Sequence, residues 1–208
     1  IVPGYRAITS KVRTQPLVDL HLPGIGVTVH LRAGRLPGGV PIYVVDAPGL
    51  YDRDGGPYQD ADGRDWSDNA WRFGVFSRAI AVVAGGAPGM VWRPAVLHCN
   101  DWHTGLAPAL LAGVPGRPGM LFSIHNLAYQ GRFAYAEFLT LRLPAPLWSP
   151  QALEFFGDLS FMKGGLVFAE FEPPESIRVE VFATRWDART LAPHGALLRA
   201  VEVPLAGP

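Results

Sequence analysis

The sequence predicts an α/β fold with a mainly parallel sheet and flanking helices, and two stretches carry that prediction. Residues 94–101 (PAVLHCND) fit a buried strand, residues 102–113 fit a helix, and residues 119–126 (GMLFSIHN) fit a second strand. A strand, a helix and a strand in close succession form a βαβ unit, whose two strands run parallel. Residues 17–32 alternate apolar and polar residues around a Pro-Gly pair, which predicts an additional β-hairpin.

The composition fits a folded domain and argues against several classes of partner. The chain has 208 residues, of which 49% are hydrophobic and 17% charged, so it has enough apolar residues for one core. Because the formal net charge is zero, nothing favours nucleic acid or a membrane surface as a partner. The single Cys99 excludes an internal disulfide and fits a reducing compartment, so we expect a cytoplasmic protein.

The first half of the chain contains three further predicted elements. Residues 39–48 fit a buried strand, and residues 49–60 fit a loop rich in Gly, Asp and Tyr. Residues 67–84 fit a helix, because apolar residues recur among the polar ones. Either Ser67 or Asp68 is expected to cap the start of this helix.

The second half is predicted to contain a loop and then helices. Residues 127–138 fit an aromatic loop, and residues 149–169 fit one or two helices that begin near Ser149. The stretch MKGGL at 162–166 lacks the spacing of a phosphate-binding loop. We therefore expect it in a helix or at a helix end, with Lys163 in solvent.

Two polar residues end the two predicted parallel strands. Asp101 ends the first strand and His125 ends the second. Ligands of open α/β sheets bind beyond the carboxyl ends of the strands, so this edge is the predicted binding site. Other interpretations are a helix cap for Asp101 and a hydrogen bond to a loop carbonyl for His125. Trp102 either stacks on a sugar ring or packs the helix.

Two further groups of residues have a structural and a functional interpretation. One group contains residue types that bind metals: His98, Cys99, Asp101 and His103. Alternation along a strand sends the side chains of His98 and Cys99 to opposite faces, and no second ligand cluster follows, so we predict no metal. The loop at residues 51–58 (YDRDGGPY) is either a surface loop with packed tyrosines or a loop whose phenol reaches a ligand.

Several long motifs follow one another in a recognisable order. They are LYDRDGGPYQD (50–60), DNAWRFGVFSRA (68–79), WRPAVLHCNDWHTGLAPALL (92–111), SIHNLAYQGRF (123–133) and LEFFGDLSFMKGGLVFA (153–169). This series resembles the bacterial glycogen synthase and plant starch synthase family. The resemblance covers residues 1–169 and implies the Rossmann-like N-terminal lobe of a GT-B glycosyltransferase. It also implies the retaining transfer of glucose from ADP-glucose, or UDP-glucose, to the non-reducing end of an α-1,4-glucan, with no metal or other cofactor.

The resemblance implies roles for individual residues. His125 resembles the histidine that contacts the transferred glucose, where it would stabilise developing oxocarbenium character. Asp101 resembles the acid that borders the sugar and acceptor pocket. Asn126, Trp102 and Tyr58 resemble further substrate contacts in that pocket. We expect positioning and electrostatics to let the leaving diphosphate assist the incoming hydroxyl, with Asp101 as a covalent nucleophile the weaker alternative.

The chain also departs from the family at both ends. The family opens with a strand and a Lys-x-Gly-Gly-Leu turn that helps bind the nucleotide sugar, and this chain begins after them. Residues 170–208 do not resemble the family, so we treat them as a divergent tail of uncertain fold. A frameshift or a chimeric assembly is one hypothesis, tested by DNA sequencing across codon 170.

The family's C-terminal lobe, which holds most of the donor site, is absent from this sequence. We therefore expect negligible glucose transfer by this chain alone. A non-catalytic α/β module that binds glucan or a partner protein is the alternative, which maltooligosaccharide binding without turnover would indicate. A poorly folded fragment is a third hypothesis, because an exposed sheet edge favours aggregation.

Overall fold

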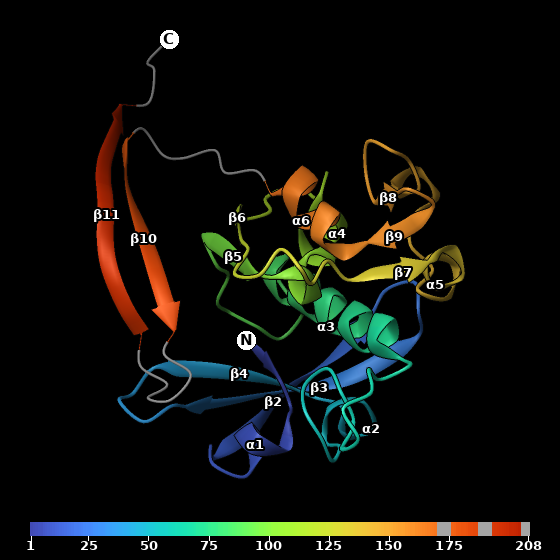
Figure 1. The fold of residues 1–208 in the computed structure, drawn as a ribbon. Coiled ribbons are helices and arrows are strands. Elements are labelled where there is room, and N and C mark those ends of the chain that lie inside the picture. Colours follow the sequence, from blue (N-terminus) through green and yellow to red (C-terminus); the bar gives the residue numbers. More distant parts are fainter. Residues whose placement is uncertain (170–175, 187–192, 205–208) are drawn as a thin grey trace. The chain divides into compact units, whose positions relative to one another are not determined.

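The computed structural model describes residues 1–169, 176–186 and 193–204 (Figure 1). The chain divides into two compact units, Ile1–Glu170 and Phe171–Pro208. No helix in the described ranges is long and apolar enough to cross a membrane.

The second unit contains one pair of strands. These are β10 (Ser176–Trp186) and β11 (Pro193–Pro204), which pair antiparallel with an irregularity between Val181 and Phe182. The sequence predicted no element in this part of the chain. The remaining residues of the predicted tail lie outside the described residues.

A mixed sheet forms one layer of the first unit. Its strands, in order across the sheet, are β1 (Val2–Pro3), β4 (Pro41–Asp46), β3 (Val27–Arg35) and β2 (Thr14–Leu22). Strands β2 and β3 pair antiparallel, which confirms the hairpin predicted at residues 17–32. Strand β4 confirms the strand predicted at residues 39–48 and pairs antiparallel with β3 and parallel with β1.

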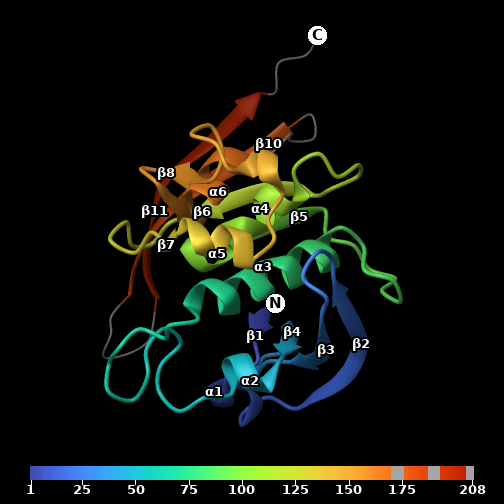
Figure 2. The ribbon, with the colours of Figure 1, turned by 90° about the vertical axis from the view of Figure 1, so that its right-hand side faces the viewer.

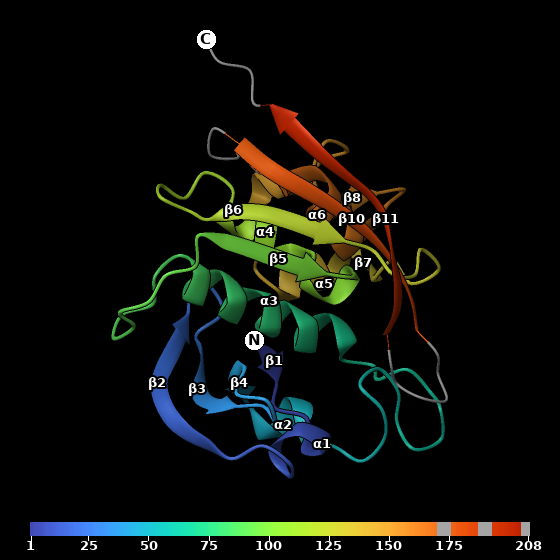
Figure 3. The same cartoon turned by 90° about the vertical axis from the view of Figure 1, so that its left-hand side faces the viewer.

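The predicted βαβ unit is confirmed. It consists of β5 (Val96–Asn100), the 3₁₀ turn η1 (Trp102–Thr104), α4 (Leu106–Leu111) and β6 (Gly119–Ser123). Figure 3 shows β5 and β6 side by side, and they pair parallel with Asn100 opposite Ser123. Pro108 lies in the first turn of α4, where its missing N–H has no partner to lose.

Helix α3 (Asn69–Ala84) lies between the mixed sheet and the layer formed by β5, β6 and α4 (Figure 2). Most of its residues are buried, as expected for a helix enclosed on both sides. Its Val75 and Ile80 belong to the core cluster that includes Leu31 of β3. Its Phe73 belongs to a second cluster with Trp102. The helix predicted at residues 67–84 is thus confirmed, and it supports both layers.

The predicted side-chain cap of this helix is wrong. Asp68 occupies the capping position, but its side chain makes no capping hydrogen bond. Both of its carboxylate oxygens instead accept hydrogen bonds from the guanidinium of Arg53, at 2.8 and 2.6 Å. A charged partner has replaced the backbone N–H groups that a cap would bind.

The prediction of a mainly parallel sheet is also wrong for the described residues. Only the pairs β1–β4 and β5–β6 are parallel there. Strands β2, β3 and β4 follow one another through short turns, and strands joined by a short turn pair antiparallel. The α/β class itself holds, because helices and mixed sheets form the first unit.

Two regions contain strands where the sequence predicted a loop or helices. Residues 127–138 include β7 (Arg132–Ala134) and the start of α5 (Tyr135–Thr140). Residues 149–169 include β8 (Glu154–Phe155), β9 (Asp158–Ser160) and only one helix, α6 (Phe161–Phe168). The strands form a sheet in the order β7-β9-β8. The remaining helical segments are short: α1 (Arg6–Thr9), α2 (Pro48–Tyr51) and η2 (Ala145–Leu147).

A tight turn explains why no helix begins at Ser149. Phe156 and Gly157 both have positive φ angles, 52° and 85°, which reverse the chain between β8 and β9. The helix starts only after Ser160, whose hydroxyl accepts a hydrogen bond from the backbone of Lys163. The expectation that Lys163 lies in solvent is wrong, since its ammonium donates to the carbonyls of Pro150 and Glu154.

Candidate active site

A cavity of about 740 Å³ opens where β5 passes into η1. Its wall combines aromatic rings with polar side chains, and part of it comes from the loop that precedes α3. The lining residues are Tyr58, Gln59, Asp65, Asn69, Asp101, Trp102, Asn126 and residues 128–133. Four of the five predicted site residues therefore lie in one cavity wall. The fifth, His125, is joined to that wall through Asp101.

Asp101 and His125 form a hydrogen-bonded pair across the two parallel strands. One carboxylate oxygen of Asp101 accepts the backbone N–H of His125 at 2.7 Å, and the other lies 2.9 Å from its Nδ1. The backbone N–H of Asp101 donates to the carbonyl of Ser123 at 2.8 Å. Asp101 makes no side-chain cap on η1, so the helix-cap interpretation is wrong. The expected loop carbonyl beside His125 is likewise replaced by this carboxylate.

The backbone of Asp101 is strained. Its φ of 57° and ψ of 173° fall in a region that is almost exclusive to glycine. Such a conformation persists only where the surroundings enforce it, and it often marks a functional site. The two hydrogen bonds to His125 are consistent with such an enforced conformation, because they hold the Asp101 carboxylate against the end of the neighbouring strand.

The protonation of the pair follows from the chemistry of its acceptor. An ionised carboxylate can only accept hydrogen bonds, so Nδ1 of His125 carries the proton that lies between them. In the neutral ring, Nε2 is then the acceptor. The His125 side chain is 46% exposed.

Trp102 packs in the core and also lines the cavity, while its stacking on a sugar ring stays a prediction. It is only 8% exposed, and its ring packs edge-on against Phe73 with ring centroids 4.9 Å apart. The same indole lines the cavity. Gly131 lies against it, and a Cβ at that position would sit 2.2 Å from the Trp102 ring. The absence of a side chain at 131 therefore lets the indole reach the cavity.

The two tyrosines of the loop at residues 51–58 have different environments. Tyr51 is buried and donates its hydroxyl to the carbonyl of Arg72 at 2.8 Å. The ring of Tyr58 lies 5.9 Å from that of Trp102, at the cavity wall, with its hydroxyl 3.4 Å from Nδ1 of His103. Burial, followed by the negative charge of Asp101, raises the pKa of Tyr58.

His103 was considered in the sequence only as a metal ligand, and the structure places it behind the cavity wall. Its ring packs against those of Tyr58 and Phe73. Burial lowers its pKa, so the neutral ring is favoured. The expected opposite orientations of His98 and Cys99 are confirmed, since His98 is exposed and Cys99 is buried. Burial raises the pKa of the Cys99 thiol to about 12.

The family model of the starch synthase catalytic domain matches residues 1–171. The chain belongs to this family. It is 49% identical over 173 residues to the glycogen synthase of Thioalkalivibrio sulfidiphilus, covering 82% of this chain and 36% of that protein. It is 47% identical over 175 residues to the glycogen synthase of Cellvibrio japonicus, with shares of 82% and 36%. The predicted resemblance is confirmed, and the chain spans about a third of the length of these curated relatives.

Several lining residues of this starch synthase family site were not predicted from the sequence. Gln59, Asp65, Tyr129 and Gln130 reach the cavity from loops, where no strand or helix period indicates direction. Arg132 also lines it and pairs with Asp158 at 2.7 Å. The motifs YDRDGGPYQD and SIHNLAYQGRF contain four of these five residues, so the family motifs were the available signal.

Proposed function

We propose that this chain supplies the acceptor side of a retaining glucosyltransferase site. The reaction is the transfer of glucose from ADP-glucose, or UDP-glucose, to the non-reducing end of an α-1,4-glucan, in glycogen or starch synthesis. Support comes from the family match and from relatives named glycogen synthase. The observation that carries the proposal is the Asp101–His125 pair at the carboxyl ends of two parallel strands, beside the aromatic cavity.

His125 is the proposed contact to the transferred glucose. Asp101 holds its Nδ1 and its backbone, which leaves Nε2 to accept a sugar hydroxyl. The carboxylate also stabilises any positive charge that the imidazole acquires. Because both carboxylate oxygens of Asp101 are engaged with His125, the structure favours an orienting role over that of a covalent nucleophile.

The rest of the cavity suits a pyranose ring, which has apolar faces and a rim of hydroxyls. Trp102 and Tyr58 offer the aromatic surface. Asn126 and Gln59 offer amides that can donate to and accept from hydroxyls. In this proposal the chain needs no metal or cofactor of its own, and its ligands are the nucleotide sugar and the glucan.

The proposal includes the absence of transfer by the chain alone. Retaining transfer requires a closed site from which water is excluded, and the family's second lobe supplies most of the donor contacts. The cytoplasmic location expected from Cys99 is part of the same proposal.

A glucose-transfer assay on two proteins tests it. One is the chain itself, and the other is a graft in which residues 1–169 replace the matching segment of the Thioalkalivibrio sulfidiphilus glycogen synthase. We expect no transfer from the chain and transfer to glycogen from the graft, with ADP-glucose and UDP-glucose assayed separately. If the graft folds but transfers nothing, while the chain itself binds maltoheptaose, the chain would instead be a glucan-binding module.

A further inference from the structure

The loop between α2 and α3 carries part of the cavity wall but contains no helix or named strand. Residues 52–68 have only one isolated bridge, between Gln59 and Asp65. Three of the loop's side chains nevertheless line the cavity: Tyr58, Gln59 and Asp65. A loop without regular hydrogen bonding needs other contacts to hold such side chains in place.

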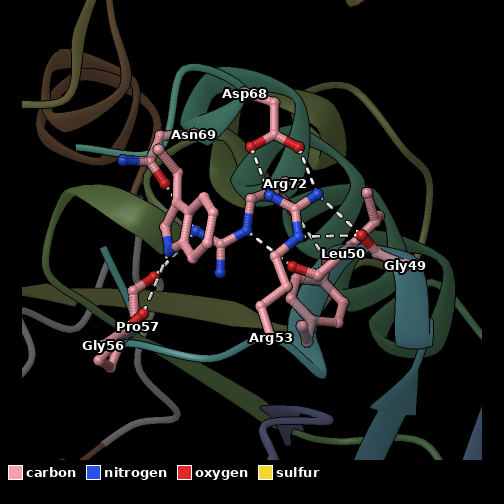
Figure 4. Close-up of polar contacts among 10 residues, drawn as sticks. Gly49, Leu50, Arg53, Gly56, Pro57, Asp68, Asn69 and Arg72 are labelled. Carbon is pink, nitrogen blue, oxygen red and sulfur yellow. Dashed lines mark hydrogen bonds and ion pairs between the residues drawn. The ribbon is translucent and has the colours of Figure 1, made fainter. Parts of the chain in front are cut away.

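Arg72 of α3 makes those contacts from inside the molecule. Arg72 is only 1% exposed, and its guanidinium donates to backbone carbonyls. Nε donates to the carbonyl of Leu50 at 2.7 Å, and Nη1 donates to that of Pro57 at 2.9 Å. Leu50 precedes the loop and Pro57 immediately precedes Tyr58, so one planar group joins both positions. Figure 4 shows Arg72 among these residues.

Asn69, one turn before Arg72, extends the contact to Tyr58 itself. Its Oδ1 accepts from Nη1 of Arg72 at 2.7 Å, and its Nδ2 donates to the carbonyl of Tyr58 at 2.9 Å. The backbone N–H of Trp66 donates to the same carbonyl at 3.0 Å. The carbonyls on both sides of the Tyr58 Cα, those of residues 57 and 58, are therefore fixed by the first turn of α3.

A second arginine, Arg53, joins the two ends of the loop through an ion pair with Asp68. Arg53 forms a two-point ion pair with Asp68 and also donates to the carbonyl of Gly49 (Figure 4). Its guanidinium lies 5.0 Å from the centre of the Trp66 ring. The guanidinium of Arg72 lies 5.8 Å from the centre of the same ring, so both arginines contact Trp66.

We propose that Arg72 is a positioning residue that holds the Tyr58 ring in the cavity wall. It does not line the cavity, and it acts through the carbonyls of Leu50 and Pro57 and through Asn69. The planar fork is essential, because the point charge of a lysine cannot hold two carbonyls and an amide in one plane. The relevance of this arrangement to glucan rests on the proposed function, but the position of Tyr58 does not.

The position of Tyr58 can be measured directly on the whole chain. The six tyrosines are replaced by 3-fluorotyrosine, and the ¹⁹F NMR resonance of residue 58 is assigned with Tyr58→Phe. In Arg72→Lys we expect the Tyr58 resonance to move toward that of free 3-fluorotyrosine. An unchanged Tyr58 resonance in a folded Arg72→Lys chain would overturn the proposal.

Arg78→Lys is the matched control. Arg78 lies on the same helix, is also buried, and donates to the carbonyls of Pro23 and Leu141 rather than to the loop. Its replacement should leave the Tyr58 resonance in place. A Tyr58 resonance that moves equally in both variants would show a general loosening of α3 and would overturn the proposal.

Asn69→Asp decides the matter if Arg72→Lys does not fold. The aspartate keeps the size of the side chain and an oxygen for Arg72, but it cannot donate to the carbonyl of Tyr58. We expect the Tyr58 resonance to move in this variant too. If it stays where it is in the wild-type chain, Arg72 and Asn69 do not position Tyr58.

A binding cycle separates this proposal from the proposed function. Arg72→Lys should weaken maltoheptaose binding about tenfold when Tyr58 is present, and by less than about twofold in the Tyr58→Ala background. Equal losses in both backgrounds would show that Arg72 does not act through Tyr58. A wild-type chain that binds no maltoheptaose would count against the proposed acceptor site, while the ¹⁹F result would still decide the positioning.

Discussion

At the scale of single residues, Asp101 combines a strained backbone with two hydrogen bonds to one partner. A conformation of this kind costs about 1–3 kcal/mol in a residue other than glycine. The bonds from its carboxylate to the backbone and ring of His125 offset that cost. The strain and the orientation of the imidazole are therefore two aspects of one arrangement.

A pair of substitutions isolates that strain. Asp101→Gly and Asp101→Ala both remove the carboxylate, but only glycine adopts φ 57° and ψ 173° without penalty. We expect the glycine variant to be more stable than the alanine variant by about 1–3 kcal/mol in urea unfolding. Equal stabilities would mean that the backbone of residue 101 relaxes without cost.

Cys99 gives a second prediction at this scale. Burial raises the pKa of its thiol from 9.0 to about 12, so the native chain keeps the thiol protonated at pH 8. Between these two values the unfolded chain releases a proton that the folded chain retains, so this group makes the folded state less stable as the pH rises. We expect DTNB to react with Cys99 at pH 8 only in denaturant. Full reaction of the native chain within seconds would contradict this burial.

At the scale of elements, patterns contained within one segment were predictable. The hairpin at residues 17–32 and the βαβ unit at residues 94–126 were found because alternation and apolar runs are local signals. The strands β8 and β9 were missed, because their turn is Phe156–Gly157 rather than the Asn-Gly pair that signals such a hairpin. The Arg53–Asp68 pair was missed because the two residues meet only after the loop folds.

The same turn gives a stability prediction. Phe156 is 84% exposed and has a φ of 52°, a conformation that asparagine adopts more readily than phenylalanine. We expect Phe156→Asn to stabilise the chain by about 0.5–1 kcal/mol in urea unfolding. The control is Leu127→Asn, an exposed apolar residue without a positive φ, which should bring no gain. An equal gain in both variants would show that replacing an exposed apolar side chain by asparagine stabilises the chain whatever its φ angle.

Arg78 links three elements and gives a prediction of opposite sign. Its guanidinium donates to the carbonyl of Pro23 in the β2–β3 turn and to those of Leu141 and Arg142 after α5. Removing it leaves a buried carbonyl without a donor, so we expect Arg78→Ala to cost about 2–4 kcal/mol in thermal or urea unfolding. Arg35→Ala, which removes an exposed arginine, should cost less than about 0.5 kcal/mol. A similar cost for both would contradict the linking role.

At the scale of the whole molecule, the centre of the site was predictable and its outer wall was not. Asp101 and His125 were predicted to lie at one edge of the sheet, because the carboxyl ends of adjacent parallel strands lie there, but their hydrogen bond was not predicted. Tyr58, Trp102 and Asn126 were assigned by the family resemblance and lie in the same cavity wall. Part of the remaining wall comes from the loop before α3, whose carbonyls at Pro57 and Tyr58 accept hydrogen bonds from Arg72 and Asn69, contacts that no sequence period reveals.

The chain spans about a third of the length of its curated relatives, so the proposed activity is best tested within a complete protein. The decisive measurement is glucose transfer from ADP-glucose to glycogen by the graft of residues 1–169, with and without His125→Ala. We predict that the graft transfers glucose and that His125→Ala lowers its kcat by at least about 100-fold without changing its melting temperature. Full activity in the His125→Ala graft, or none in a correctly folded wild-type graft, would contradict the proposal that this cavity is one side of a glucosyltransferase site.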